Sequence, residues 1–258
     1  MNFEDLLHPA VASSALEQWR NRHYRDAVLN SVIALFDLLR ARTGLQMDGA
    51  ELAERAFSER KPYLVTGDLS TESGRNSQIG VMLLARGLYQ GVRSPGVHST
   101  AKSWTAEQAA RLMVTASAIA QLIDDAQQGD VLRFDGVYVA TSSDDTNIVR
   151  FFEDGNVLRV SVSRGVDDDW VPDWLTLDWA EWQGKRKDQY RGTYEVDGKW
   201  IRFTIQTLGG EIRCEGQVAG PSIRVRTHGT ATGHRSEKTY HFRPYPRPGS
   251  QRGVEVDD

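Results

Sequence analysis

The chain has 258 residues, 40% of them hydrophobic and 26% charged, and a formal net charge of −4. This balance is typical of an ordinary soluble globular protein. The negative net charge argues against a chain that coats nucleic acid non-specifically, but it leaves room for a local basic site. The length is too great for one small core and predicts two domains.

The sequence offers no sign of a metal, a disulfide or a membrane segment. Cys214 is the single cysteine and has no partner for an internal disulfide, and no Cys/His cluster has the spacing of zinc ligands. No apolar stretch reaches the ~18 residues of a membrane span, and Met1 to His8 lacks a signal pattern. We therefore expect a cytoplasmic protein with no cofactor and no membrane partner.

The first half, up to about Gln128, has apolar residues at helical spacing and predicts a bundle of about five helices. In the second of these, six apolar residues form one wide stripe: Ala27, Val28, Val32, Leu35, Phe36 and Leu39. Pro9 suits a first turn, Gly44 ends a helix, and Asp48 and Thr105 suit N-caps. The segment 60–74 is polar and is expected to be a connection. The predicted helices cover about residues 8–22, 24–43, 47–57, 76–92 and 105–126.

After Gly129 the hydrophobic period changes to two, which predicts β-strands. Two-residue hairpin turns are expected at Asp154-Gly155 and Asp197-Gly198, and a third reversal at Gly220-Pro221. About eight strands in sequential hairpins suit an up-and-down barrel. The predicted fold class is therefore α+β with two domains: an all-α domain over 1–129, an antiparallel barrel over 130–245 and a disordered tail over 246–258.

A connection within the strand half is rich in tryptophan and acidic residues. It is interpreted as a plug or lid over the open end of the barrel, with a binding box as the alternative. Asp167 to Asp169 predict a solvated acidic loop, or else a calcium site. The tryptophans concerned are Trp170, Trp174, Trp179 and Trp182.

The stretch "LYQGVRSPGVHST" combines an arginine and a histidine on a short, bent segment. A helix is expected to end at Gly91-Val92, because Pro95 prevents an ordinary continuation. Arg93 offers a rigid fork for a phosphate, and His98 can transfer protons near neutral pH. Together they suit cleavage of a phosphodiester by its neighbouring 2′-hydroxyl. The simpler alternative is that Arg93 caps the preceding helix and His98 satisfies a loop.

Several blocks of the first half resemble the HEPN superfamily of helical-bundle ribonucleases, and within it the bacterial Ymh-like branch catalogued with abortive-infection proteins. The resemblance covers roughly residues 8–126 and includes "HP", "YRDAVLNSVIALFDLLR", "DGAELAERAF" and "LLARGLYQGVRSPGVH". The family's last segment usually reads G-hydrophobic-R-N-P-x-x-H. This chain departs from it at Ser94, where the family favours asparagine.

The resemblance implies that Arg93 holds the scissile phosphate, that Ser94 assists and that His98 acts in proton transfer. It also implies an RNA substrate and a homodimer in which two motifs face each other across the interface. Together with the motif it predicts a metal-independent endoribonuclease in antiphage defence or a toxin–antitoxin pair. The alternative is a catalytically inert HEPN-like dimer that binds RNA, a nucleotide or a protein; Ser94 favours this reading.

The strand half resembles the lipocalin-like (calycin) architecture in its strand count and its "FDGVY" opening. Barrels of about eight strands can hold one small ligand. The resemblance therefore implies a module that senses a small molecule. A dimerisation module, or a docking module for a partner such as an antitoxin, is the alternative.

Overall fold

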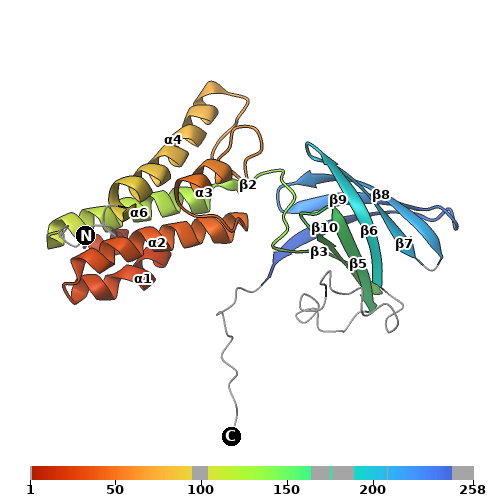
Figure 1. Ribbon diagram of the computed structural model, residues 1–258, viewed down its shortest axis with the longest axis horizontal. Coiled ribbons are helices and arrows are strands. Elements are labelled where there is room, and N and C mark those ends of the chain that lie inside the picture. The colour runs from red at the N-terminus through yellow and green to blue at the C-terminus, as the bar shows by residue number, and fades with distance from the viewer. Residues whose placement is uncertain (1, 95–103, 164–174, 176–188, 208, 246–258) are drawn as a thin grey trace, which may run out of the picture. The chain divides into compact units, whose positions relative to one another are not determined.

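The computed structural model describes residues 2–94, 104–163, 175, 189–207 and 209–245 (Figure 1). The chain divides into two compact units, residues 1–131 and 132–258. The first unit is helical and the second contains a closed antiparallel barrel, so the predicted α+β, two-domain fold class is confirmed.

The helical unit contains the five predicted α-helices, preceded by a 3-10 turn. Pro9 lies in the first turn of its helix, as predicted, because it has no N–H to leave unpaired there. The elements are η1 (Phe3–Leu6), α1 (Pro9–Arg20), α2 (Tyr24–Thr43), α3 (Gly49–Ala56), α4 (Glu72–Leu88), a π-helical turn η2 (Tyr89–Arg93) and α6 (Ala106–Asp125).

Two other predicted helix ends are also confirmed. Gly44 follows α2 with a left-handed φ of 76°, a conformation that glycine adopts without strain. Thr105 caps α6: its hydroxyl accepts from the N–H of Gln108, and the Gln108 side chain accepts from the N–H of Thr105. This reciprocal arrangement is a capping box.

The core of this unit is built on α2, which packs against α1, α3 and α6. The six residues of the predicted apolar stripe on α2 are all buried. Phe36 is the largest of them and lies in the main core cluster with Leu52 of α3 and Ile123 of α6. Hydrophobic burial of this stripe is therefore what orders the bundle.

The expected connection over 60–74 is more structured than its composition suggests. Leu64–Val65 form a short strand, β1, which pairs antiparallel with β2 (Gln127–Gln128). The N–H of Gly129 continues this contact by donating to the carbonyl of Tyr63 at 2.9 Å. In addition α4 begins at Glu72, four residues before the predicted start, because the Thr71 hydroxyl caps it.

The second unit contains an eight-stranded barrel in which strands adjacent in sequence pair antiparallel and β10 pairs with β3 to close it (Figure 1). This is the predicted up-and-down order. The strands are β3 (Gly136–Thr141), β4 (Asp145–Phe151), β5 (Asn156–Ser163), β6 (Gln189–Asp197), β7 (Trp200–Thr207), β8 (Gly210–Ala219), β9 (Ser222–Gly229) and β10 (Arg235–Pro244).

The strand register tests the predicted turns. Gly220-Pro221 is a two-residue turn as expected, because Ala219 pairs with Ser222. The β6–β7 turn is Gly198-Lys199, one residue later than predicted, since Asp197 itself pairs with Trp200. Asp154-Gly155 belongs to a three-residue loop with Glu153, in which Gly155 has a φ of 87°. Glycines with positive φ mark where the chain reverses direction, but the number of residues in each loop depends on the strand register.

Alternate residues of each barrel strand face inward. Tyr138, Phe151, Phe203 and Ile201 form a buried cluster there, with the rings of Tyr138 and Phe203 both edge-on to Phe151. The opposite face of β3 to β5 carries a second cluster that includes Leu175. The four tryptophans of the predicted plug and Asp167 to Asp169 lie outside the described residues, as does the predicted tail. Among the helices described, none has the length and apolar character needed to cross a membrane.

Candidate functional site

Arg93 and Ser94 lie on the π-helical turn η2 and directly after it, at the C-terminal end of α4. Ser94 keeps helical dihedral angles (φ −58°, ψ −53°), and its N–H donates to the carbonyl of Tyr89. The prediction that the helix ends at Gly91-Val92 is therefore wrong. Gly91 disfavours a helix by only about 1 kcal/mol, and Val92 packs against the helical core. His98, the third predicted site residue, lies outside the described residues.

The guanidinium of Arg93 is held by the aromatic residue one turn before it. Its Nη1 donates to the hydroxyl oxygen of Tyr89 at 2.8 Å, and its Cζ lies 5.0 Å from the centre of the Tyr89 ring. The Arg93 side chain is nevertheless 28% exposed. Single π-helical turns inside α-helices are frequently found at functional sites. Here the turn presents a cation that is both fixed and accessible.

Asp48, which immediately precedes α3, connects this pair to a second arginine. The Tyr89 hydroxyl donates to Asp48 Oδ2 at 3.4 Å, and Arg93 Nη1 is 3.9 Å from the same oxygen. Arg40 of α2 donates from Nη1 to Asp48 Oδ1 at 2.9 Å and from Nη2 to Asp37 Oδ1 at 2.6 Å. Asp48 was predicted as an N-cap, and it holds that position, but its carboxylate binds these side chains instead of capping the helix.

These contacts set the charge of the cluster. Partial burial opposes ionisation of Asp48, but the N–H of Gly49 and the guanidinium groups of Arg40 and Arg93 favour the carboxylate more strongly. The net result is a pKa for Asp48 below its usual value. Asp48 is therefore a carboxylate near neutral pH and balances the two arginines beside it.

The position of the Tyr89 ring depends on two neighbours. The ring of Phe36 meets it edge-on at a centroid distance of 4.9 Å. On the other side is the backbone of Gly49, with a φ of 63°; a Cβ there would lie 2.7 Å from Tyr89 Cε1. Gly49 thus provides both the left-handed backbone and the space that let Tyr89 reach Asp48.

Sequence reasoning missed Tyr89, Asp48 and Arg40 as the surroundings of Arg93. The Tyr89–Arg93 pair has a local signal, because residues four apart on a helix are neighbours. The contact with Asp48 spans 41 residues along the chain and has no such signal. Ser94 is half-buried and directly follows Arg93 in the chain.

A second polar cluster lies at one end of the barrel interior. Asp145 and Asn147 lie on the face of β4 that also carries the inward-facing Val149 and Phe151. Asn147 is fully buried; its Oδ1 accepts from Arg159 Nη2 at 2.7 Å and from Ser161 Oγ at 2.9 Å.

The amide of Asn147 donates to Asp145 Oδ2 at 2.8 Å. Lys238 Nζ donates to Asp145 Oδ1 at 3.1 Å, while the Nε of Arg159 is buried with no partner among the described residues. A buried, unused donor in a polar network is costly unless something else accepts from it.

Charges and burial shift the titration of this interior. Hydrogen bonds from Ser142, Asn147 and Lys238 outweigh partial burial and lower the pKa of Asp145 to about 2. Burial raises the pKa of Cys214 to about 12, although Arg159 nearby opposes the shift. Burial likewise raises the pKa of Tyr240. At neutral pH this end of the barrel therefore holds a carboxylate, two cations and neutral hydroxyl and thiol groups.

The other histidines of the described region lie away from Arg93 in sequence, at helix ends or in the strand half. His8 precedes α1 and its Nδ1 accepts from the N–H of Ala10, while Nε2 lies 3.1 Å from Asp124 Oδ2. His23 is exposed between α1 and α2. His228, His234 and His241 belong to no metal-binding group: in the described part of the chain, no three His, Cys, Asp or Glu side chains are placed to hold a metal ion.

Among solved structures, a rhizavidin–biotin complex is 18% identical, with a TM-score of 0.26 and coverage of 45% of this chain and 99% of that chain. A comparison with curated proteins found no match. In the helical half, residues 5–123 match the model of a family described as a protein of unknown function (Hypoth_ymh). This match agrees with the Ymh-like resemblance of the sequence, and its description names no activity.

Proposed function

We propose that the protein is a metal-independent endoribonuclease in which Arg93 holds the scissile phosphate, Ser94 assists and His98 transfers protons. The observation that carries the proposal is the state of the Arg93 guanidinium. The guanidinium is partly exposed, and its Nη1 donates a hydrogen bond to the Tyr89 hydroxyl. No described residue accepts a hydrogen bond from its Nε or Nη2. Two parallel N–H groups on one edge of a guanidinium match two phosphate oxygens.

In the proposed reaction the substrate supplies its own nucleophile. The 2′-oxygen forms a bond to phosphorus as the bond to the 5′-oxygen breaks, and a 2′,3′-cyclic phosphate results. The 2′-hydroxyl proton leaves to a base and the departing 5′-oxygen gains a proton, both tasks suited to imidazole chemistry at His98. Arg93 balances the charge that builds up on the phosphate oxygens. No metal has a role in this scheme.

Tyr89 and Asp48 act as positioning residues for Arg93 in this proposal. The Asp48 carboxylate accepts from the Tyr89 hydroxyl, which makes the hydroxyl oxygen a better acceptor for Arg93. A bare carboxylate 3.9 Å from Arg93 would also repel an incoming phosphate. Arg40 offsets that charge, because it bonds Asp48 from the side of α2.

A homodimer through the helical domain is part of the proposal, and the outer face of α4 supports it. Gly80, Leu84, Gly87 and Gly91 recur every three or four residues and so share one face of the helix. A Cβ added at any of these three glycines would meet no described atom within 4 Å, and Leu83 and Leu84 are each 51% exposed. Such a bare, apolar face suits a second helix. We expect Leu84→Glu to shift the sedimentation of the protein from dimer to monomer, whereas Leu122→Glu on α6 leaves it dimeric.

We further propose that the barrel is a ligand sensor or partner module, and that the whole acts in antiphage defence or with an antitoxin. The unused Arg159 donor inside the barrel supports a ligand. A ligand can regulate cleavage only by binding one state of the protein more tightly than the other. A catalytically inert, dimeric binding protein is the second candidate. Ser94 favours it, because the resembled motif has asparagine there, and so does the Asp48 carboxylate that already faces Arg93.

RNA cleavage in EDTA tests the proposal. The wild-type protein should cleave and leave 2′,3′-cyclic phosphate ends, whereas Arg93→Ala and His98→Ala should not. Arg111→Ala is the matched control, since Arg111 is 77% exposed on α6 and pairs only with Glu107 four residues before it among the described residues. Loss of cleavage on chelation would exclude the mechanism. Binding of RNA without cleavage by the wild type would favour the inert candidate.

A further inference from the structure

The outer face of β7 to β10 carries a regular array of arginines beside an exposed tryptophan. The strand pairing aligns the outward residues in three rows across the sheet. The rows read Trp200–Gln217–Arg224, then Arg202–Glu215–Arg226–Glu237, then Thr204–Arg213–His228–Arg235. Trp200 is 56% exposed, more than any other large hydrophobic residue in the described part of the chain.

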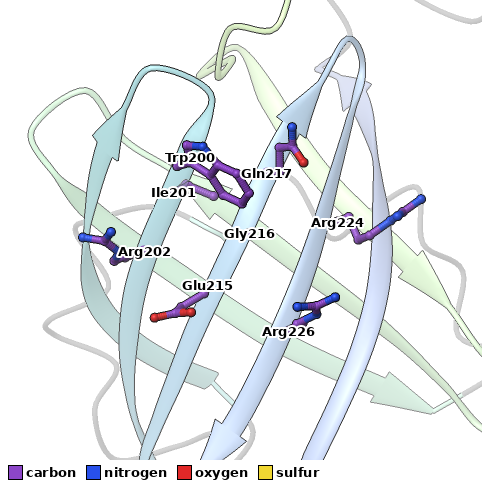
Figure 2. Close-up of a pocket in the computed structure, with 8 residues that line it drawn as sticks. All are labelled: Trp200, Ile201, Arg202, Glu215, Gly216, Gln217, Arg224 and Arg226. Carbon is purple, nitrogen blue, oxygen red and sulfur yellow. The ribbon is translucent and has the colours of Figure 1, made fainter.

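This face is hollowed rather than flat. The first hollow has a volume of about 370 Å³. In Figure 2 Trp200 and Gln217 lie at one end of it, and the side chains of Arg202, Arg224 and Arg226 lie around it. A second hollow of about 570 Å³ adjoins it, because Glu215 and Arg226 line both. Gly216 also lines the first hollow. The two hollows form one groove, which we call the arginine groove.

The arginine groove has a positive excess on a chain of net charge −4. Five arginines face outward in the three rows: Arg202, Arg213, Arg224, Arg226 and Arg235. Two glutamates, Glu215 and Glu237, line the two hollows with these arginines, and Glu211 lies beside Arg213 on β8. On the neighbouring strand β6, Glu195 is in register with Arg202 and Asp197 with Trp200.

Ion pairing leaves much of this positive charge available. Glu237 is shared by Arg226 at 3.0 Å and Arg224 at 3.9 Å, and Glu211 pairs with Arg213 at 2.7 Å. Arg202 has no ion-pair partner among the described residues. Arg224 and Arg226 remain 73% and 79% exposed. Exposed guanidinium groups at fixed intervals on a sheet can bind a chain of phosphates.

We propose that the arginine groove binds single-stranded RNA, with a base stacked on Trp200 and the backbone phosphates on Arg224 and Arg226. This rests on the proposed function and adds a substrate-binding surface to it. A flat, exposed indole beside cations is the combination that holds unpaired bases without sequence preference. In a duplex the bases are already stacked on each other and the indole has nothing to stack on. The groove therefore selects single strands.

A protein partner fits this face less well. Protein interfaces are also enriched in tryptophan and arginine, but their centres are depleted of charged residues. In the arginine groove the residues common to both hollows, Glu215 and Arg226, are charged and exposed. Arg224 and Arg226 on β9 share one described ion-pair partner, Glu237, so part of their positive charge would stay unpaired against an apolar protein partner. The phosphates of a polyanion neutralise this charge.

The test measures binding of a short, fluorescein-labelled oligouridine to the full-length His98→Ala protein by fluorescence anisotropy over a range of salt concentrations. Removal of cleavage by His98→Ala keeps the probe intact. Trp200→Ala should weaken binding about tenfold, the loss of one stacked base. Arg224→Ala with Arg226→Ala should lower the slope of log affinity against log salt by about 1.4, since each phosphate contact contributes about 0.7. Arg111→Ala, an equally exposed arginine on α6, should leave both quantities unchanged.

Unchanged affinity and unchanged salt dependence in the groove variants would overturn the proposal. So would equal affinity for a duplex of the same sequence. If the groove variants instead abolish self-association or capture of a protein and leave RNA binding intact, the face is a protein interface and the proposal is wrong. Thermal unfolding of each variant checks the fold. If the wild-type protein cleaves no RNA but oligouridine binding still depends on Trp200, the nuclease proposal is overturned and the groove proposal stands. If the wild-type protein cleaves RNA and every groove variant keeps both cleavage and affinity, the groove proposal is overturned and the nuclease proposal stands.

Discussion

Replacement of Gly49 by alanine tests whether the backbone of α3 sets the position of Tyr89. The left-handed φ of 63° at Gly49 costs an alanine about 1–2 kcal/mol. The new Cβ would also lie 2.7 and 2.8 Å from two ring carbons of Tyr89, which Phe36 and Arg93 hold from other sides. Overpacking of this kind costs about 1–3 kcal/mol. We therefore expect Gly49→Ala to lower the free energy of unfolding by about 2–5 kcal/mol.

Thermal unfolding followed by helical circular dichroism measures this effect. For a unit of this size each kcal/mol corresponds to roughly 4 °C in Tm, so the transition of the helical unit should fall by roughly 8–20 °C. In a Tyr89→Leu background the ring is absent and only the backbone cost of about 1–2 kcal/mol should remain. If Gly49→Ala is equally destabilising with and without the tyrosine, the steric argument is refuted. If it is harmless in both, the backbone argument fails as well.

Three further predictions concern the rest of the molecule. The lowered pKa of Asp145, about 2 in the folded state, means that its contribution to stability is complete above its unfolded pKa near 4 and is lost as the pH falls toward 2. Because the Asp145 side chain is 38% exposed, its contribution to the free energy of unfolding is roughly 1 kcal/mol after solvent screening. Urea unfolding should therefore give a free energy that is lower at about pH 3 than at about pH 6. Asp145→Asn should remove this difference between the two pH values. Cys214 is buried and its pKa is raised to about 12, so an aromatic disulfide reagent should react with it only after denaturation; fast reaction in the native protein would contradict the closed barrel. Thr105→Ala should cost about 1 kcal/mol in helical stability through loss of the N-cap, while Thr105→Ser should be nearly neutral.

The features that the sequence predicted well are those whose physics is local. Caps such as Thr105 and Gly44 act over one helical turn, and the change from period 3.6 to period 2 near Gly129 follows directly from which faces are buried. The positions of Gly155 and Gly198 marked the hairpins. Their loop lengths differed from expectation because the register is set by pairing across the sheet, which a single strand does not reveal.

The features that the sequence could not predict depend on contacts between distant segments. The approach of Asp48 to Tyr89 requires α3 to pack beside the end of α4, and nothing near either residue announces it. The same holds for Asn147 and Lys238, which meet at Asp145 only because β10 closes the barrel against β3. The outward rows on β7 to β10 likewise appear only once the register is known. Sequence reasoning singled out Arg93 as a candidate but did not identify the side chains that contact it.

The short pairing of β1 with β2 determines where the helical unit can be cut. Gln127 and Gln128 lie beyond residue 123, where the family match ends, yet they pair with Val65 and Leu64. Gln128 also donates from Nε2 to the carbonyl of Arg42 at 2.9 Å. A fragment trimmed at 123 would leave these groups unpaired and expose Leu64, which is fully buried. The shortest fragment of the helical unit that folds on its own therefore extends through Gly129. A shorter fragment should leave the edge of β1 unpaired and should aggregate through it.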